Sequence, residues 1–215
     1  MRQVQKSSAN PVFPCAGAER GVATCAGLDL SLTGAGVAVL KTDGSVVSKT
    51  FGYGLTKDAT ERDQGDRIIS ITNSIIGFLK PFSVRYIGLE NYAFSTRNPH
   101  FLSRISELGG VVKLQLRLNF QLVPLVVPAT SVRRFLLGKS TNDKKVVEDF
   151  LRQLGHTTPK TADEFDALAV AKVVDAWANH RSAVVDDHRL EVLERLDYQR
   201  SRVVAAAQIK KRGKK

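Results

Sequence analysis

Four carboxylates stand out in this sequence because each lies beside apolar residues. Asp29 lies inside an apolar segment punctuated by glycines, and Glu90 ends a short apolar run. Asp163 and Asp166 lie three residues apart, just before a run of small apolar residues. A carboxylate next to a buried segment needs a hydrogen-bond partner, a metal ion or a proton, because burying it bare is costly compared with a domain's net stability. These four residues are therefore the first candidates for chemistry.

Four carboxylates of this kind suit a site for divalent metal ions. Mg²⁺ prefers oxygen ligands, and two such ions about 3.5 to 4 Å apart can activate a water and stabilise the leaving oxygen of a phosphodiester. Two other interpretations stay open at this point. Asp29 could hydrogen-bond the backbone of its own turn, and Asp163 and Asp166 could simply favour the dipole at the start of a helix.

The composition bounds the class of protein and its partners. A chain of 215 residues with 43% hydrophobic residues predicts one substantial core. A formal charge of +11 favours a polyanionic partner, and nucleic acid rather than a membrane, because no basic amphipathic helix with aromatic anchors stands out. Cys15 and Cys25 fit no disulfide or metal pattern, and no leader or membrane-spanning segment is evident. We expect a cytoplasmic protein.

The elements that must position the carboxylates follow from the apolar pattern. Strands are expected at 22–31, 35–41, 45–52, 84–90 and 121–127, a short turn at 131–137, and helices at 61–80, 98–119, 142–154, 161–180 and 186–207. Asp43-Gly44 is a strong hairpin signal, so the first three strands form an antiparallel meander. The later alternation of strands and helices favours parallel strands. The predicted class is α/β, with a mixed five-stranded sheet flanked by helices.

The sequence also suggests a division of the chain. Residues 1–20 lack periodicity and predict a flexible arm, residues 21–182 predict the main domain, and residues 183–215 predict a helix with a basic tail. After Asp197 the chain carries seven Lys and Arg residues and no acidic residue. Such a tail is available to phosphate groups, although it could serve solubility alone.

Four motifs follow one another along residues 27–177. They are Gly27-Leu28-Asp29, Leu89-Glu90-Asn91 with aromatics after it, Val132-Arg133-Arg134-Phe135-Leu136-Leu137-Gly138 running into Asn142-Asp143-Lys144-Lys145-Val146-Val147, and Asp163-Glu164-Phe165-Asp166-Ala167-Leu168-Ala169. In this order they resemble the RuvC Holliday-junction resolvases of the RNase H-like superfamily. The resemblance implies an RNase H-like fold and a homodimeric, metal-dependent endonuclease that cleaves four-way or other branched DNA. Arms outside the family core are common among its bacteriophage versions.

The resemblance also implies roles for particular residues. Asp29, Glu90, Asp163 and Asp166 would bind Mg²⁺ or Mn²⁺, two ions per active site, and Lys144 would contact the scissile phosphate. DNA contacts are expected from the aromatic Phe94, with Tyr92 as its alternative, and from Arg97, Arg133, Arg134, Lys139, Lys145, Lys210, Lys211 and Arg212. The helix at 98–119 is the expected dimer interface. The sequence departs from the family where Arg133 replaces a usual lysine and Asn91 a common glutamine.

Three other functions compete with this one. A ribonuclease H acting on RNA/DNA hybrids would add a carboxylate from the first helix, which offers Glu61, Asp63 and Asp66. The segment around Asp29 also resembles the first phosphate loop of actin-like and Hsp70-like ATPases, but those proteins need two lobes, so no nucleotide cofactor is expected. A DNA-binding module without catalysis is disfavoured because all four carboxylates are present.

Overall fold

The structure is a computed structural model that describes residues 23–91, 99–139, 141, 143–184 and 186–212. The N-terminal arm expected from the sequence lies outside these residues. None of the helices within the described ranges is long and apolar enough to cross a membrane.

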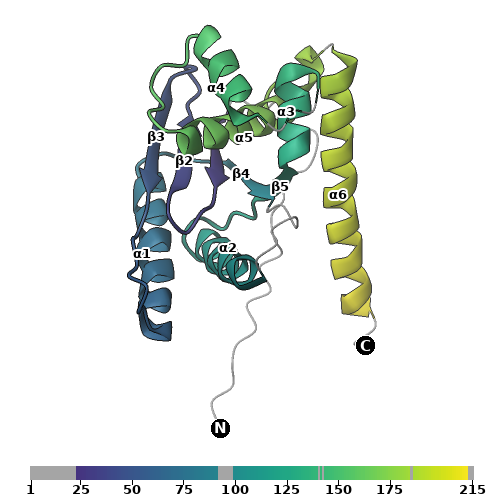
Figure 1. The fold of residues 1–215 in the computed structure, drawn as a ribbon. Helices are drawn as coiled ribbons and strands as arrows, with labels where there is room; N and C mark the ends of the chain where they lie inside the picture. Colours follow the sequence, from purple (N-terminus) through teal and green to yellow (C-terminus); the bar gives the residue numbers. More distant parts are fainter. Residues whose placement is uncertain (1–22, 92–98, 140, 142, 185, 213–215) are drawn as a thin grey trace.

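A mixed five-stranded sheet forms the centre of the fold (Figure 1). Its strands are β1 (Cys25–Asp29), β2 (Ala35–Leu40), β3 (Val46–Phe51), β4 (Tyr86–Asn91) and β5 (Leu125–Pro128), in the spatial order β3-β2-β1-β4-β5. The first three strands pair antiparallel, β4 runs parallel to β1, and β5 runs parallel to β4. The predicted fold class is confirmed. So is the hairpin at Asp43-Gly44, where Gly44 has a φ of +83° and its amide donates to the Lys41 carbonyl oxygen over 3.0 Å.

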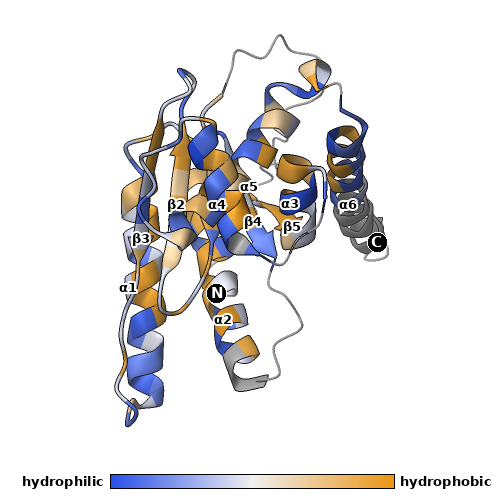
Figure 2. Cartoon of the chain, turned by 45° about the horizontal axis from the view of Figure 1, so that its top comes forward, coloured by the Kyte–Doolittle hydropathy of each residue, from blue (hydrophilic) through white to orange (hydrophobic). Residues whose placement is uncertain are grey.

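Helices cover both faces of the sheet (Figure 1). They are α1 (Glu61–Leu79), α2 (Pro99–Phe120), α3 (Ala129–Leu137), α4 (Lys144–Gln153), α5 (Ala162–Ala178), the short 3₁₀ turn η1 (Arg181–Ala183) and α6 (Asp187–Arg212). Helices α1 and α2 pack on one face, and α3, α4 and α5 lie over the other. Each face has its own apolar cluster, which is why the strands between them are hydrophobic almost throughout (Figure 2).

Helix α5 lies unusually close to the central strands. A Cβ atom added to Gly27 of β1 would lie 2.0 Å from the Ala167 carbonyl oxygen, and one added to Gly88 of β4 would lie 2.5 Å from Val174 Cγ2. Because both positions lack a side chain, the helix rests on the strand backbone itself. The small residues Ala167 and Ala171, both fully buried, complete this contact from the helix side.

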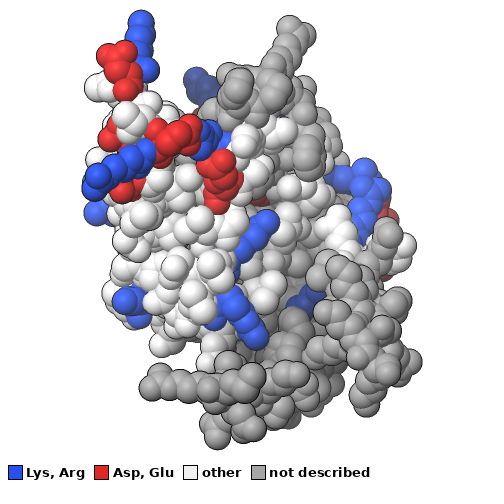
Figure 3. All heavy atoms as spheres, turned by 90° about the horizontal axis from the view of Figure 1, so that it is seen from below, with Lys and Arg blue, Asp and Glu red and all other residues white. Residues whose placement is uncertain are grey.

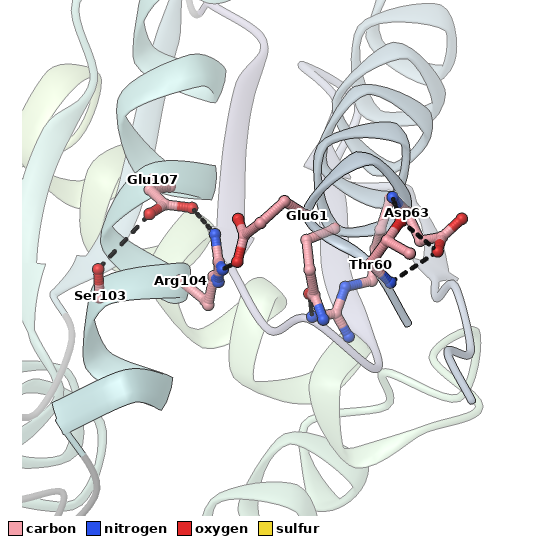
Figure 4. Close-up of polar contacts among 8 residues, drawn as sticks. Thr60, Glu61, Asp63, Ser103, Arg104 and Glu107 are labelled. Atoms are coloured by element: carbon pink, nitrogen blue, oxygen red, sulfur yellow. Dashed lines mark hydrogen bonds and ion pairs between the residues drawn. The ribbon is translucent and has the colours of Figure 1, made fainter. Parts of the chain in front are cut away.

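On the opposite face, α1 and α2 are joined by ion pairs (Figure 4). Arg104 of α2 bridges Glu61 at the start of α1 and Glu107 one turn further along its own helix. Helix α1 begins with a capping box, in which Thr60 and Asp63 each accept a hydrogen bond from the other's backbone N–H. The side chains in Figure 4 thus fix the beginning of α1 against α2.

The fifth strand and the segment after it differ from what was expected. The fifth strand begins at Leu125 rather than at 121, because Gln121 has a left-handed φ of 58° that ends α2. The short turn expected at 131–137 is a complete helix, α3, which Pro128 precedes and Gly138 ends in a left-handed conformation with φ of 72°.

Helix α6 is anchored to the domain along its first half. Val192, Leu193 and Leu196 are buried in the same apolar cluster as α3 and α5. The Trp177 indole N–H donates to Asp197 over 2.8 Å, and the Arg200 guanidinium lies 4.7 Å from the Trp177 ring centre. The division into a domain at 21–182 and a segment at 183–215 stays a prediction, while the beginning of α6 shares the core of α3 and α5.

Candidate active site

Asp29 and Glu90 end the two central parallel strands of the sheet. Leu28 of β1 pairs with Leu89 of β4, so Asp29 and Glu90, which follow them, are level with one another. Parallel strands that end together bring the side chains at their carboxyl ends to one edge of the sheet. The two carboxylates expected from distant parts of the sequence are therefore neighbours across β1 and β4.

Both carboxylates belong to the face of the sheet that α5 covers. Gly27 and Gly88 face α5, as their close approach to that helix shows. Side chains alternate along a strand, so residues two positions further on lie on the same face. Asp29 and Glu90 are therefore on the α5 side of the sheet.

The beginning of α5 lies over the same place. Gly36 of β2 pairs with Asp29, and a Cβ atom added to Gly36 would lie 2.0 Å from the Asp163 carbonyl oxygen. A Cβ atom added to Gly34 would lie 2.6 Å from the Asp163 Oδ2 atom. Asp166, three residues further along α5, is buried with 8% of its surface exposed. Two glycines thus make room for the Asp163 carboxylate beside the strand that carries Asp29.

The donor set at this edge consists of carboxylates alone. Hard oxygen ligands of this kind fit Mg²⁺ or Mn²⁺ and do not suit a zinc site of His and Cys. All four carboxylates interact with neighbouring groups. In the described part of the chain, no three His, Cys, Asp or Glu side chains are already gathered as ligands for one metal ion. The register and the glycines place Asp29, Glu90 and Asp163 at one edge, and ligation of one metal ion would need the carboxylates to turn toward one another.

Glu164 is a further carboxylate of this region, and the sequence analysis did not single it out. It is buried with 6% exposed, and it accepts hydrogen bonds from the Ser48 hydroxyl over 2.6 Å and from the Lys160 backbone N–H over 3.0 Å. The Thr161 hydroxyl caps α5 by accepting from the Glu164 backbone N–H over 3.2 Å. The pattern Thr161-Ala-Asp-Glu164 is that of a capping box, and this signal in the sequence could have identified the residue.

The basic segment that precedes α5 has its own contacts. Arg133 of α3 donates to the Thr141 carbonyl oxygen over 2.8 Å, and Arg134 forms an ion pair with Glu191 of α6. Lys139 and Lys145 are exposed. The structure thus leaves Lys139 and Lys145 accessible to a ligand, and it uses both arginines to hold neighbouring segments.

Lys144 is the first residue of α4. The preceding Asp143 caps this helix by accepting a hydrogen bond from the Lys145 backbone N–H over 2.9 Å. The Lys144 side chain lies outside the described part of the structure. Phe94, Tyr92 and Arg97 also lie outside the described residues, and so do the side chains of Lys210, Lys211 and Arg212, whose backbone forms the last turn of α6.

The carboxylates of the first helix have local partners. Glu61 pairs with Arg104, Asp66 lies 4.0 Å from Arg62, and the hydrogen bonds from Thr60 lower the pKa of Asp63 below its ordinary value. Helix α1 also packs on the face of the sheet opposite α5. These contacts explain the acidic residues of α1 as parts of the helix surface, so the structure does not call for them as further ligands next to Asp163.

The sheet order and the helices on its two faces are those of an RNase H-like fold. The sequence model of the family described as "Crossover junction endodeoxyribonuclease RuvC" matches residues 25–173, which is more than half of the chain. The chain therefore belongs to the RuvC family, and it is a structure-selective endonuclease of crossover junctions. Nucleases of this family depend on metal ions.

Comparison with individual proteins agrees with this assignment. The crossover junction endodeoxyribonuclease RuvC of Streptomyces griseus is 26% identical over 147 residues, which cover 67% of this chain and 71% of that protein. The structure of Thermus thermophilus RuvC superposes with a TM-score of 0.55 at 20% identity, over 74% of this chain and 96% of that one. T. thermophilus RuvC in complex with a Holliday junction substrate gives the same TM-score of 0.55 at 18% identity, over 69% of this chain and 90% of that one. These two structures share the fold.

Proposed function

We propose that this protein cleaves four-way DNA junctions by metal-assisted hydrolysis, with Asp29, Glu90, Asp163 and Asp166 as the ligands of two Mg²⁺ or Mn²⁺ ions. The observation that carries the proposal is the register of the sheet. Asp29 and Glu90 are level on adjacent parallel strands, and Gly36, the partner of Asp29, lies directly beneath Asp163. The T. thermophilus relative was solved with a Holliday junction substrate, which supports the same substrate here.

Each residue of the proposed site would have a distinct role in phosphodiester hydrolysis. Metal ions bound at the carboxylates would supply an activated water and charge stabilisation for the leaving oxygen. Asp29 and Glu90 end the adjacent parallel strands β1 and β4, and α5 carries Asp163 and Asp166. Lys144, at the start of α4, would contact the scissile phosphate as a cation. The backbone contacts of α5 with the sheet hold these groups in place before DNA binds.

The DNA surface would combine several basic segments. Lys139 and Lys145 are exposed next to α4, and the net charge of +11 favours association with phosphates. Arg133 and Arg134 would act on DNA from positions already fixed by Thr141 and Glu191. We include Phe94 or Tyr92 as the stacking aromatic, together with Arg97, Lys210, Lys211 and Arg212, as the family resemblance implies.

A homodimer would use the exposed side of α2. Leu114 and Leu118 are 55% and 65% exposed, and Gly110 lies one turn before them on the same side of the helix. A Cβ atom at Gly110 would meet nothing within 4 Å, so nothing in the described part of the chain requires a glycine there. A glycine inside a helix costs about 1 kcal/mol relative to alanine, and the close approach of a second chain is a reason to keep it.

Charged side chains are unevenly spread over this side of the molecule. Figure 3 shows it from the side of α1 and α2, with charged side chains of both signs gathered at one corner and scattered Lys and Arg side chains over the wider area beyond it. A two-fold dimer needs a self-complementary patch, which the apolar Leu114 and Leu118 would supply, with the exposed Lys113 and Arg117 at its border. Two active sites in such a dimer would face two strands of one junction.

We infer the cytoplasm as the compartment of this activity. The family acts on crossover junctions of DNA, and Cys25 is a free, buried thiol, as is usual in a reducing compartment.

The proposal is tested by cleavage of synthetic DNA in the presence of Mg²⁺ or Mn²⁺. A four-way junction, a flap, an RNA/DNA hybrid and a linear duplex of equal length are compared for the wild type, Asp29→Asn and Glu90→Gln. Asp58→Asn, a change at an exposed carboxylate outside the site, is the matched control. We expect the wild type and Asp58→Asn to cut the four-way junction, and both site variants to lose at least about 100-fold in rate. Junction cleavage by Asp29→Asn at the wild-type rate would refute the proposed site.

A further inference from the structure

The first turn of α5 is tied to β3 by a group of polar side chains. The Ser48 hydroxyl donates to Glu164 Oε2 over 2.6 Å, and the Thr50 hydroxyl lies 2.6 Å from the Thr161 hydroxyl and 3.4 Å from Glu164 Oε1. The Lys160 backbone N–H donates to the same Glu164 Oε2 atom over 3.0 Å. We refer to Ser48, Thr50, Thr161 and Glu164 as the β3 clamp.

One strand residue of the β3 clamp lies in the same row of the sheet as Asp29. Thr50 pairs with Gly36, and Gly36 pairs with Asp29, so these three residues form one row across β3, β2 and β1. Ser48 pairs with Ala38 two rows away, on the same face of the sheet as Thr50. The clamp therefore holds α5 from the edge strand, at the level of Asp29.

Glu164 stands between two proposed metal ligands in the sequence. Asp163 precedes it and Asp166 follows two residues later, so any rotation of the first turn of α5 moves all three carboxylates together. Glu164 itself turns toward β3, where Ser48 and Lys160 satisfy it. A carboxylate buried to this extent would be costly without such donors. The contacts with Ser48, Thr50 and the Lys160 backbone N–H give the Glu164 carboxylate one fixed orientation.

We propose that Glu164 is a positioning residue of the metal site, which acts through Ser48 and Thr50 to fix Asp163 over Gly34 and Gly36. The proposal rests on the proposed function, since it assigns a role toward the metal ligands named there. Glu164 binds neither metal nor DNA in this scheme. Its role is to hold the first turn of α5, and with it the Asp163 backbone, in place over the strands.

The first test measures metal affinity apart from cleavage. The melting temperature of the full chain is followed while Mg²⁺ or Mn²⁺ is added, because a bound metal stabilises the folded state. We expect Glu164→Gln and Ser48→Ala to raise the half-saturating metal concentration, by roughly 10-fold or more for Glu164→Gln, since partners of metal ligands typically contribute about 10- to 100-fold. Glu194→Gln, an exposed carboxylate on α6, is the matched control and should titrate as the wild type.

The second test separates positioning from general damage. Junction binding without metal should be unchanged in Glu164→Gln and Ser48→Ala, and high metal concentrations should restore most of the cleavage rate. A double variant, Ser48→Ala with Glu164→Gln, should show little more than the larger single effect, because both changes break one contact.

The outcomes distinguish this inference from the proposed function. If Asp29→Asn abolishes cleavage while Glu164→Gln and Ser48→Ala titrate metal like the wild type, the clamp has no positioning role and only this inference fails. If Asp29→Asn cleaves like the wild type, the proposed function fails first. Should Glu164→Gln not fold, Ser48→Ala decides alone, because it leaves Glu164 with its contact to the Lys160 backbone N–H.

Discussion

Gly36→Ala tests whether a missing side chain sets the geometry of the site. The added Cβ would lie 2.0 Å from the Asp163 carbonyl oxygen and 2.4 Å from its carbonyl carbon, and real Cβ contacts essentially never fall under 3.0 Å. The first turn of α5 must therefore move by about 1 Å or more, since both clashing atoms are backbone and cannot rotate away. The φ of Gly36 is not left-handed, so alanine adds the clash without backbone strain.

The magnitude follows from this displacement. Overpacking of a close contact destabilises by about 1 to 3 kcal/mol, which we would measure as a change in the free energy of unfolding in urea. A displacement of about 1 Å in a catalytic group can cost about 100-fold in rate, which single-turnover cleavage of a four-way junction would report. The loss of activity should exceed what the loss of folded protein explains, because at these energies most molecules stay folded.

A matched control separates the clash from the chemistry of the substitution. Gly77→Ala makes the same change in α1, at a site where the added Cβ meets nothing within 4 Å. We expect unchanged cleavage and a stability equal to the wild type or higher by up to about 1 kcal/mol, from the better helix propensity of alanine. If Gly36→Ala cleaves within about threefold of Gly77→Ala, the close approach of α5 does not set the active geometry, and the reasoning is wrong.

Three further predictions concern other parts of the molecule. The pKa of Asp63 is lowered by its hydrogen bonds with Thr60, so the stabilising contribution of this carboxylate is present above its ordinary pKa of 3.8 and is lost as the pH falls through the lowered value. Asp63→Asn should therefore melt below the wild type at neutral pH, with a difference that shrinks in acid; a difference independent of pH would contradict this. Leu114→Glu with Leu118→Glu should convert a dimer to a monomer in sedimentation velocity, and an unchanged mass would remove α2 as the interface. Deletion of residues 200–215 should weaken junction binding more at low salt than at high salt, and an identical slope of affinity against salt would argue against phosphate contacts by the tail.

The elements and the four carboxylates were predictable because their signals are local. Apolar alternation and periodicity indicate strands and helices, and a charge such as Asp29 in an apolar segment marks an anomaly without any knowledge of the fold. Asp43-Gly44 likewise predicts its own hairpin. The family motifs predict which of the carboxylates belong together, and the register of β1 and β4 makes Asp29 and Glu90 level. Their role as metal ligands stays a prediction.

The remaining features depend on pairings between distant segments. Nothing in the sequence shows that Gly36 lies beneath Asp163, or that Ser48 reaches Glu164, since 127 and 116 positions separate these residues. The ion pair of Arg134 with Glu191 spans 57 positions. Arg134, which was expected at the DNA, therefore also anchors α6. Register and helix placement are tertiary information, which residue patterns do not specify alone.

The glycine contacts between α5 and the sheet also bear on how the protein meets its substrate. The backbone of α5 contacts β1 at Gly27 and β2 at Gly36 with no side chain between them. The helix therefore cannot slide or tilt without disrupting the packing of the core. We therefore expect the amides of α5 to exchange with solvent only on global unfolding, with or without DNA. The backbone at the carboxylate edge would then keep one conformation when DNA binds. The DNA, and not the protein, would have to bend to bring a scissile phosphate to Asp29.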